Sequence, residues 1–127
     1  MKFEEDDPNR IQYTYEGMWS NDSMEGPGTY LDNSNHTIFN GQMAQGKKES
    51  GTLKMAGGEE YYGHFDEDGL FTGYSEFRWK TGKAYHGDFT AGLIEGQGVM
   101  RYRNGDKFTG LFVDGKISEG EMLYSED

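Results

Sequence analysis

Aromatic and small residues alternate with polar residues in short runs along most of the chain. In the run YHGDF, Tyr85, Gly87 and Phe89 occupy alternate positions. The polar His86 and Asp88 lie between them. Residues two apart point to the same face of a β-strand, so this pattern predicts a strand with one apolar and one polar face. A helix would need apolar residues three and four positions apart, and the runs do not supply them.

The run YHGDF is one of five related opening modules. Each has an aromatic residue, a glycine two positions later and a large apolar residue two positions after that. The five modules are Tyr15–Trp19, Phe39–Met43, Tyr61–Phe65, Tyr85–Phe89 and Phe108–Phe112. Their central glycines, at positions 17, 41, 63, 87 and 110, are spaced by 24, 22, 24 and 23 residues. A nearly fixed period of this length is typical of repeat proteins.

A closing module follows each opening module at a similar period. The closing modules begin at Gly28, Gly51, Gly73, Gly98 and Gly120, with spacings of 23, 22, 25 and 22 residues. Glycines suited to hairpin turns follow four opening modules, at Gly46, Gly69, Gly92 and Gly115. Turn residues also link the repeats, at Asp32–Asn35, Gly57–Gly58, Thr81–Gly82 and Asn104–Gly105. The modules therefore predict an antiparallel meander of ten or eleven strands, the eleventh lying before Ile11.

These modules resemble the MORN repeat, in which an aromatic-x-Gly-x-aromatic strand is followed by a G-x-G element and a second strand. The resemblance covers five units, from about Tyr15 to Tyr124. The second unit has Met43 for the second aromatic residue and Glu49 for the first glycine of G-x-G. The third has Phe71 at that glycine and a turn that is one residue longer, and the fifth has Ser118.

The resemblance implies an all-β fold: an elongated single antiparallel sheet of β-hairpin repeats. We expect a MORN-repeat domain over residues 15–127, preceded by residues 1–14 as either a tail or a partial capping repeat. The resemblance also implies an interaction scaffold without catalytic residues. By family analogy, such chains serve cytoskeletal or ciliary assemblies.

Composition agrees with a repeat architecture. Only 33% of the 127 residues are hydrophobic and 20 are glycine, which suits a one-dimensional stack better than a closed two-layer core. There is no cysteine, and the acidic start MKFEEDDPNR has no apolar run like that of a signal peptide. No stretch approaches the length of roughly 20 apolar residues needed to span a membrane. A cytoplasmic location is therefore the expectation.

The formal net charge of −11 narrows the range of partners. It disfavours binding to nucleic acid and to anionic lipid, both of which rely on Lys and Arg. Peripheral phospholipid binding is the alternative function that the family name suggests, and the acidity opposes it. The charge serves either to keep a glycine-rich chain in solution or to attract a basic partner.

Residues suited to catalysis or metal binding do not form a recognisable set. His64 and His86 fall on the polar face of two opening strands, and no further ligands accompany them at a metal-binding spacing. The acidic run Asp66–Gly69 is typical of a hairpin turn and does not match a calcium loop. No nucleophile–base pair supports the rival hypothesis of a small hydrolase. We therefore predict no enzyme activity, no cofactor and no metal.

The apolar face is the remaining candidate site. A single sheet has an apolar face with no second layer, so either the sheet curls to cover it or a partner does. Trp79 lies one alternation beyond Phe77, where another repeat has Asn104, and we interpret it as a ring beyond the repeat pattern. The partner is expected to be a protein with an apolar segment and a basic rim, or a larger multi-subunit assembly. The predicted protein-binding residues are Trp19, Tyr30, Phe65, Phe77, Trp79, Phe89, Tyr102 and Phe112.

Overall fold

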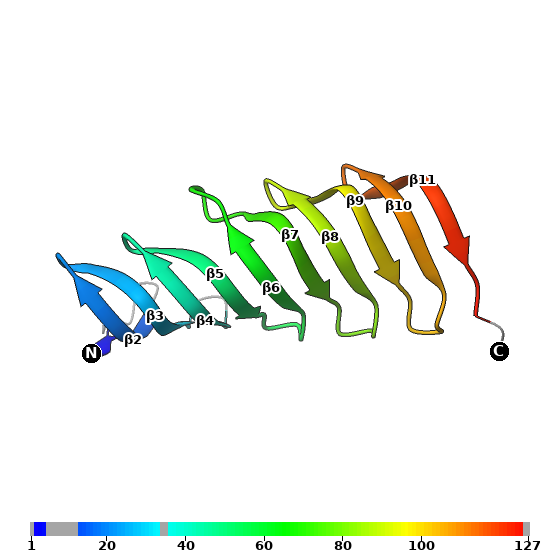
Figure 1. The fold of residues 1–127 in the computed structure, drawn as a ribbon. Coiled ribbons are helices and arrows are strands. Elements are labelled where there is room, and N and C mark those ends of the chain that lie inside the picture. Colours follow the sequence, from blue (N-terminus) through cyan, green and yellow to red (C-terminus); the bar gives the residue numbers. More distant parts are fainter. Residues whose placement is uncertain (1, 5–12, 34–35, 126–127) are drawn as a thin grey trace.

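A single curved sheet makes up the protein (Figure 1). The computed structural model describes residues 2–4, 13–33 and 36–125. Within these residues eleven strands form one sheet in sequence order, each antiparallel to its neighbours, and there is no helix. The strands are β1 (Lys2–Glu4), β2 (Tyr13–Ser20), β3 (Ser23–Asp32), β4 (Thr37–Ala44), β5 (Lys47–Lys54), β6 (Glu60–Phe65), β7 (Phe71–Arg78), β8 (Ala84–Thr90), β9 (Leu93–Arg101), β10 (Lys107–Val113) and β11 (Lys116–Leu123). The predicted all-β meander of ten or eleven strands is confirmed.

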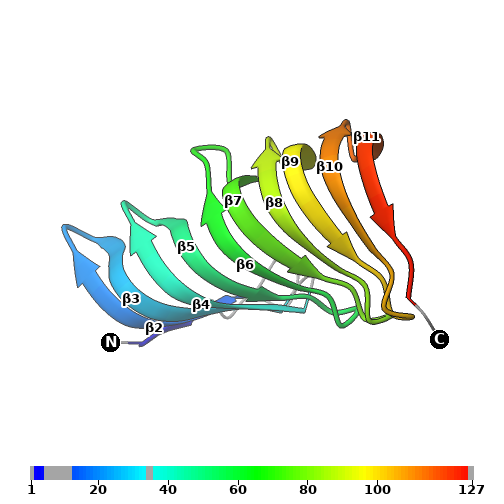
Figure 2. The same ribbon diagram turned by 45° about the vertical axis from the view of Figure 1, so that its right-hand side comes forward.

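The strands are bent along their length, so the sheet forms an elongated trough (Figure 2). Each repeat is a hairpin. The even-numbered strands β2 to β10 hold the opening modules, and the odd-numbered strands β3 to β11 hold the closing modules. Turns within a hairpin lie along one long edge, which we call the tip edge. Turns between hairpins lie along the other, which we call the link edge (Figure 1).

Paired glycines lie beneath a tyrosine ring in the fourth hairpin. Gly87 of β8 is opposite Gly98 of β9, and the ring of Tyr85 covers both. A Cβ added at Gly87 would lie 2.3 Å from the Tyr85 hydroxyl oxygen and 2.5 Å from the Gly98 Cα. The Tyr85 hydroxyl donates a hydrogen bond to the Asp88 carbonyl oxygen at 3.0 Å, and Tyr85 is 0% exposed. Glycine is needed here because the ring and the facing backbone fill the space that a side chain would take.

The third hairpin differs from the sequence prediction. Its closing module begins at Ser75 and not at Gly73, because Ser75 is opposite Gly87, as Gly98 is opposite Gly110. Gly73 is opposite Phe89 instead and has a φ of +78°, so it is the bulge glycine that begins G-x-G in other units. The assignment of Phe71 to that position was therefore wrong by two residues. The turn of this unit is longer, as predicted, but by more than the one residue expected, because five residues separate β6 from β7 and two separate the strands of each other hairpin.

Phe71 has a different role, which it shares with Met24 and Ile94. The carbonyl oxygen of each accepts a hydrogen bond from the turn glycine of the next hairpin, with distances of 3.0 Å for Gly92 to Phe71, 3.0 Å for Gly46 to Met24 and 2.9 Å for Gly115 to Ile94. These bonds tie the first tip to the second, the third to the fourth and the fourth to the fifth. The turn glycine of the third hairpin, Gly69, instead donates to the Asp66 carbonyl oxygen of its own turn at 2.9 Å.

The link turns after β5, β7 and β9 share one geometry. In each, the residue that begins the turn donates to a carbonyl four positions later and accepts from a glycine three positions later, as Trp79 does with Lys83 and Gly82. The predicted turns at Gly57–Gly58, Thr81–Gly82 and Asn104–Gly105 are confirmed. The predicted turn Asp32–Asn35 lies partly outside the described residues.

At the amino-terminal end, β1 pairs with β2, and Phe3 is opposite Tyr15. This is the place that the closing strand of a preceding repeat would occupy. Most of residues 1–14 lie outside the described part of the chain, so the division into residues 1–14 and 15–127 stays a prediction.

Candidate protein-binding face

Aromatic rings form a ladder along the apolar face of the sheet. Within each of four hairpins, the two rings of the opening module meet edge to face, as Tyr85 and Phe89 do with centroids 5.3 Å apart. Between hairpins, the first ring of one unit meets the second ring of the next. The pair Tyr85 and Phe112, 5.1 Å apart, is an example. Edge-to-face contacts of this kind stabilise the stack beyond the area that they bury.

The ladder covers part of the face that the sequence assigned to a partner. Of the eight predicted binding residues, Phe65, Phe89 and Phe112 are buried, with exposed fractions of 9%, 4% and 1%. The other five are half-buried and pack against the ladder: Trp19, Tyr30, Phe77, Trp79 and Tyr102. The sheet therefore covers its own central rows, while the flanking side chains keep accessible surface. The binding role of all eight residues stays a prediction.

Two hollows interrupt the apolar face. The smaller, of about 240 Å³, is bounded by Phe77, Trp79 and Phe89, together with Phe71, Leu93, Ile94, Gly92 and Gly115. It brings together three of the predicted binding residues, from β7, β8 and the turn between them. The larger, of about 390 Å³, is lined by Tyr30 and Phe65 and by charged residues near both edges. Apolar hollows with a few polar groups are the usual form of a binding site.

Trp79 is not an extra ring, contrary to the sequence interpretation. It begins the link turn after β7, in the same place as Met55 after β5 and Tyr102 after β9. The comparison with Asn104 came from the misplaced register of the third unit. The centres of the Trp79 and Phe77 rings are 4.7 Å apart. The Lys83 ammonium lies 4.4 Å from the centre of the Trp79 ring. The position of Trp79 remains suited to binding, because it borders the smaller hollow.

Lys48 is a member of the larger hollow that sequence reasoning missed. It occupies the position of Met24 and Ile94 in other hairpins, on the apolar face, because Glu49 forms the bulge of the second unit. The Lys48 ammonium lies 4.8 Å from the centre of the Tyr30 ring. Burial lowers the pKa of Lys48, while the nearby Asp32 carboxylate acts in the opposite direction. The bulge at Glu49 was the signal that could have placed Lys48 on this face.

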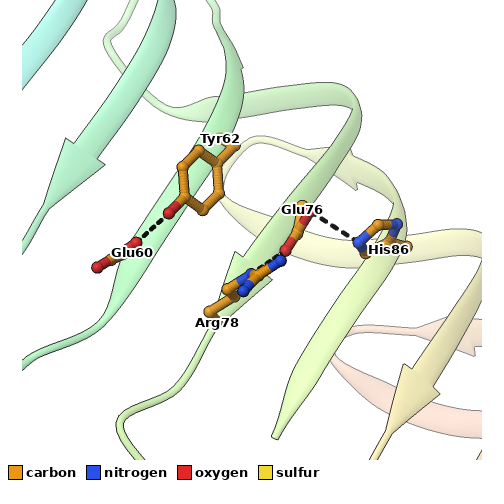
Figure 3. A network of polar contacts seen from close by, with 5 residues as sticks. All are labelled: Glu60, Tyr62, Glu76, Arg78 and His86. Atoms are coloured by element: carbon orange, nitrogen blue, oxygen red, sulfur yellow. Dashed lines mark hydrogen bonds and ion pairs between the residues drawn. The ribbon is translucent and has the colours of Figure 1, made fainter. Parts of the chain in front are cut away.

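The opposite face of the sheet carries polar side chains together with exposed apolar ones such as Met18, Ile38 and Val113. Across β6, β7 and β8 it shows Tyr62 bonded to Glu60, and Glu76 paired with both Arg78 and His86 (Figure 3). The distance from the His86 Nε2 to the Glu76 Oε1 is 2.7 Å. No group of three or more His, Asp or Glu side chains in the described residues could hold a metal ion. This face therefore resembles a solvated surface with local ion pairs.

The described residues thus define a repeat protein of stacked β-hairpins with an aromatic face that two hollows interrupt. The family model of the MORN repeat matches residues 15–37 and 85–107. These stretches begin at the first and fourth hairpins, and the remaining three hairpins follow the same antiparallel order in the sheet. The chain therefore contains MORN repeats at these two places, and its meander of β-hairpins is consistent with MORN repeats. Such repeats generally bind proteins or lipids. No curated protein matched it. The described part of the chain has no helix of the length and apolarity needed to cross a membrane.

Proposed function

We propose that this protein is a non-enzymatic protein–protein interaction module and that its apolar face binds an apolar segment of a partner protein. The smaller hollow is the observation that carries the proposal. Phe77 and Trp79 present accessible ring surface beside the buried Phe89. An aromatic side chain next to a preformed hollow is the usual setting of an interface residue with a large share of the binding energy.

The tip edge next to this face is acidic near the third hairpin. The turn between β6 and β7 holds Asp66, Glu67 and Asp68, and the last two border the larger hollow. Basic residues at one rim of the partner would meet these carboxylates. Exposed charge pairs of this kind speed association more than they add affinity.

Random peptides displayed on phage and selected on the purified protein test the proposal. A synthetic copy of a selected peptide should bind Trp79→Ala weaker than the parent by about 2 kcal/mol, if Trp79 dominates the interface. His64→Ala and Asp88→Ala, on the polar face, are the matched controls and should bind like the parent. If the controls lose binding and Trp79→Ala does not, the binding face is the polar one.

Family analogy extends the proposal to a scaffold or assembly subunit in the cytoplasm, within a cytoskeletal or ciliary complex. Peripheral phospholipid binding is the second candidate, since MORN repeats bind lipids as well as proteins. The Lys and Arg residues within residues 78–84 and 101–107, at the link edge, favour it, and the net charge of −11 opposes it. Sedimentation with phosphatidylserine vesicles at physiological salt separates the two, and we expect no binding.

A further inference from the structure

Basic side chains gather on a short part of the link edge. The chain has only 12 Lys and Arg residues against 23 Asp and Glu. Six of the 12 lie in two link segments, residues 78–84 and 101–107, which contain a single acidic residue, Asp106. We call these six the basic ridge: Arg78, Lys80, Lys83, Arg101, Arg103 and Lys107. Half of the Lys and Arg residues of an acidic protein thus lie in two link turns and the strand ends that flank them.

The two loops are neighbours in the sheet. Ala84 at the start of β8 is opposite Arg101 at the end of β9, and Arg101 is opposite Lys107 of β10. The repeat therefore brings the two segments side by side on the link edge, as the course of β7 to β10 shows (Figure 1). A local positive field forms where the loops meet, although the net charge of the molecule is negative.

Glycines in the preceding turn hold two of these cations in a row. The stem of Lys80 lies across Gly58, with its Cδ 3.1 Å from where a Cβ would stand. The stem of Arg103 lies across Gly82 in the same way, with its Cγ at 3.2 Å. Because the two residues are one hairpin apart, their backbones are separated by two strand spacings, about 10 Å. The side chains of Lys80 and Arg103 are both exposed.

Among the described residues, most of the ridge has no carboxylate partner. Arg78 pairs with Glu76, and Lys83 lies over Trp79. In the part of the chain that the structure describes, no carboxylate lies within ion-pair distance of Lys80, Arg101 or Arg103. Like charges held this close favour an anionic partner that relieves their repulsion.

The ridge is continuous with the proposed binding hollow through Trp79. The Trp79 ring borders the hollow, and the link turn that it begins contains Lys80 and Lys83. We propose that the ridge binds an acidic protein segment: the partner places an apolar side chain in the hollow beside Trp79 and carboxylates against Lys80 and Arg103. The inference rests on the proposed function and adds that the part of the partner at the link edge is acidic.

The two edges then orient the partner. Carboxylates of the tip edge at Asp66–Asp68 attract its basic side, and the ridge attracts its acidic side. A reversed segment would place like charges together at both edges, which disfavours it. The charge distribution favours a protein segment over a membrane, because a broad anionic surface would also face the remaining acidic residues of a molecule with a net charge of −11.

Peptide selection on charge-reversed variants tests the inference. Phage-displayed random peptides are selected on the parent, on Lys80→Glu/Arg103→Glu and on the control Lys54→Glu/Lys116→Glu. The control has the same net charge as the ridge variant, and both of its exposed lysines lie outside the ridge. The parent and the control should select peptides with Asp or Glu next to an aromatic or aliphatic residue. The ridge variant should lose that acidic enrichment.

Synthetic peptides make the same comparison quantitative. A selected acidic peptide should bind the ridge variant about tenfold weaker than the control, because the variant replaces two attractive exposed charge pairs with repulsive ones. Its copy with Gln for Glu and Asn for Asp should bind the parent about tenfold weaker as well. The difference should shrink as salt is raised. Circular dichroism of each variant checks that the sheet is intact.

The outcomes separate the two proposals. Apolar peptides without acidic enrichment, still sensitive to Trp79→Ala, would overturn the acidic segment and leave the proposed function standing. If no selected peptide binds Trp79→Ala more weakly than the parent, both proposals are overturned. Phosphatidylserine vesicles test the membrane alternative. If the parent and the control bind vesicles and the ridge variant does not, the ridge binds a membrane and the acidic-segment proposal is overturned.

Discussion

The Tyr61 hydroxyl lies 2.9 Å from the hydroxyl of Ser75, the residue that replaces glycine in the third hairpin. The Tyr61 oxygen is also 2.6 Å from the His64 carbonyl oxygen, and the Ser75 hydroxyl donates to the Thr72 carbonyl oxygen at 3.3 Å. In the fourth hairpin, glycine stands at the position of Ser75, and the Tyr85 ring covers it. The third hairpin thus keeps the buried tyrosine by giving its hydroxyl a side-chain partner.

Ser75→Ala should therefore destabilise the protein by about 1 kcal/mol, the usual net contribution of a hydrogen bond. The methyl group fits where Cβ already lies, so the loss comes from the hydroxyl alone. Urea unfolding followed by circular dichroism measures it. Thr90→Ala, which removes an exposed hydroxyl, is the control and should leave the midpoint unchanged. Equal midpoints for the two variants would show that the Tyr61–Ser75 contact has no energetic role.

The same hairpin shows where sequence reasoning ended. Alternation and period were enough to predict the strands, the turns and the shared face of Tyr85, Gly87 and Phe89, because these depend on local pattern. They misplaced the third closing module because Gly73 looks like the glycine that pairs across the hairpin. Only the strand register shows that Gly73 forms the bulge and Ser75 takes the paired position.

The burial of side chains on the proposed binding face was not predicted, for a related reason. A sequence shows which residues point to one face, but not how far their rings reach. The rings of Phe65, Phe89 and Phe112 fold onto the tyrosine or phenylalanine of the preceding hairpin and become buried. The basic ridge was also invisible to overall composition, since the net charge hides where cations gather until the link turns are placed side by side.

Gly87→Ala should cost about 1–3 kcal/mol, the typical cost of overpacking a filled site. The added methyl group would lie 2.3 Å from the Tyr85 hydroxyl oxygen and 2.5 Å from the Gly98 Cα. Urea denaturation gives the change. The double variant Tyr85→Phe/Gly87→Ala removes the first contact but not the second, so it should not recover the loss. Recovery would mean that the backbone contact is harmless and the hydroxyl alone excludes a side chain.

Glu95→Ala should loosen the last hairpin tip. The Glu95 carboxylate accepts the Asp114 amide at 2.7 Å, and Glu25 makes the matching bond to Gln45 at 3.0 Å. Without the carboxylate, hydrogen exchange of the Asp114 amide should speed up about tenfold, since bonds to charged groups contribute roughly 1.5 kcal/mol or more.

The amide of Gln45 is the internal reference for that exchange experiment, and Glu119→Ala, at an exposed position, is the control variant. Glu119→Ala should leave the exchange rate of the Asp114 amide unchanged. The exchange rate of the Gln45 amide should be the same in Glu95→Ala as in the parent. If Asp114 exchanges at the parent's rate in Glu95→Ala, the backbone bond from Gly115 to Ile94 holds the tip without help from the carboxylate.

Alkaline pH should destabilise the protein through Tyr85. Burial raises the pKa of Tyr85 to about 12, above the ordinary value of 10.0, and the Asp88 charge acts in the same direction. Between these two values the unfolded chain releases the tyrosine proton and the folded protein keeps it. The free energy of unfolding must then fall as the pH rises from about 10 towards about 12.

Tyr85→Phe tests this linkage, because phenylalanine cannot ionise. At about pH 9 the variant should be less stable than the parent by about 1 kcal/mol, through the lost hydrogen bond to the Asp88 carbonyl oxygen. At about pH 11 the gap should narrow, since only the parent loses stability through this tyrosine. Urea unfolding at intervals across this range gives both curves. Tyr61, whose pKa burial also raises, and Lys48, whose pKa burial lowers, are present in both proteins, so their contributions cancel. A gap that stays constant to about pH 11 would show that Tyr85 ionises as readily in the folded protein as in the unfolded chain.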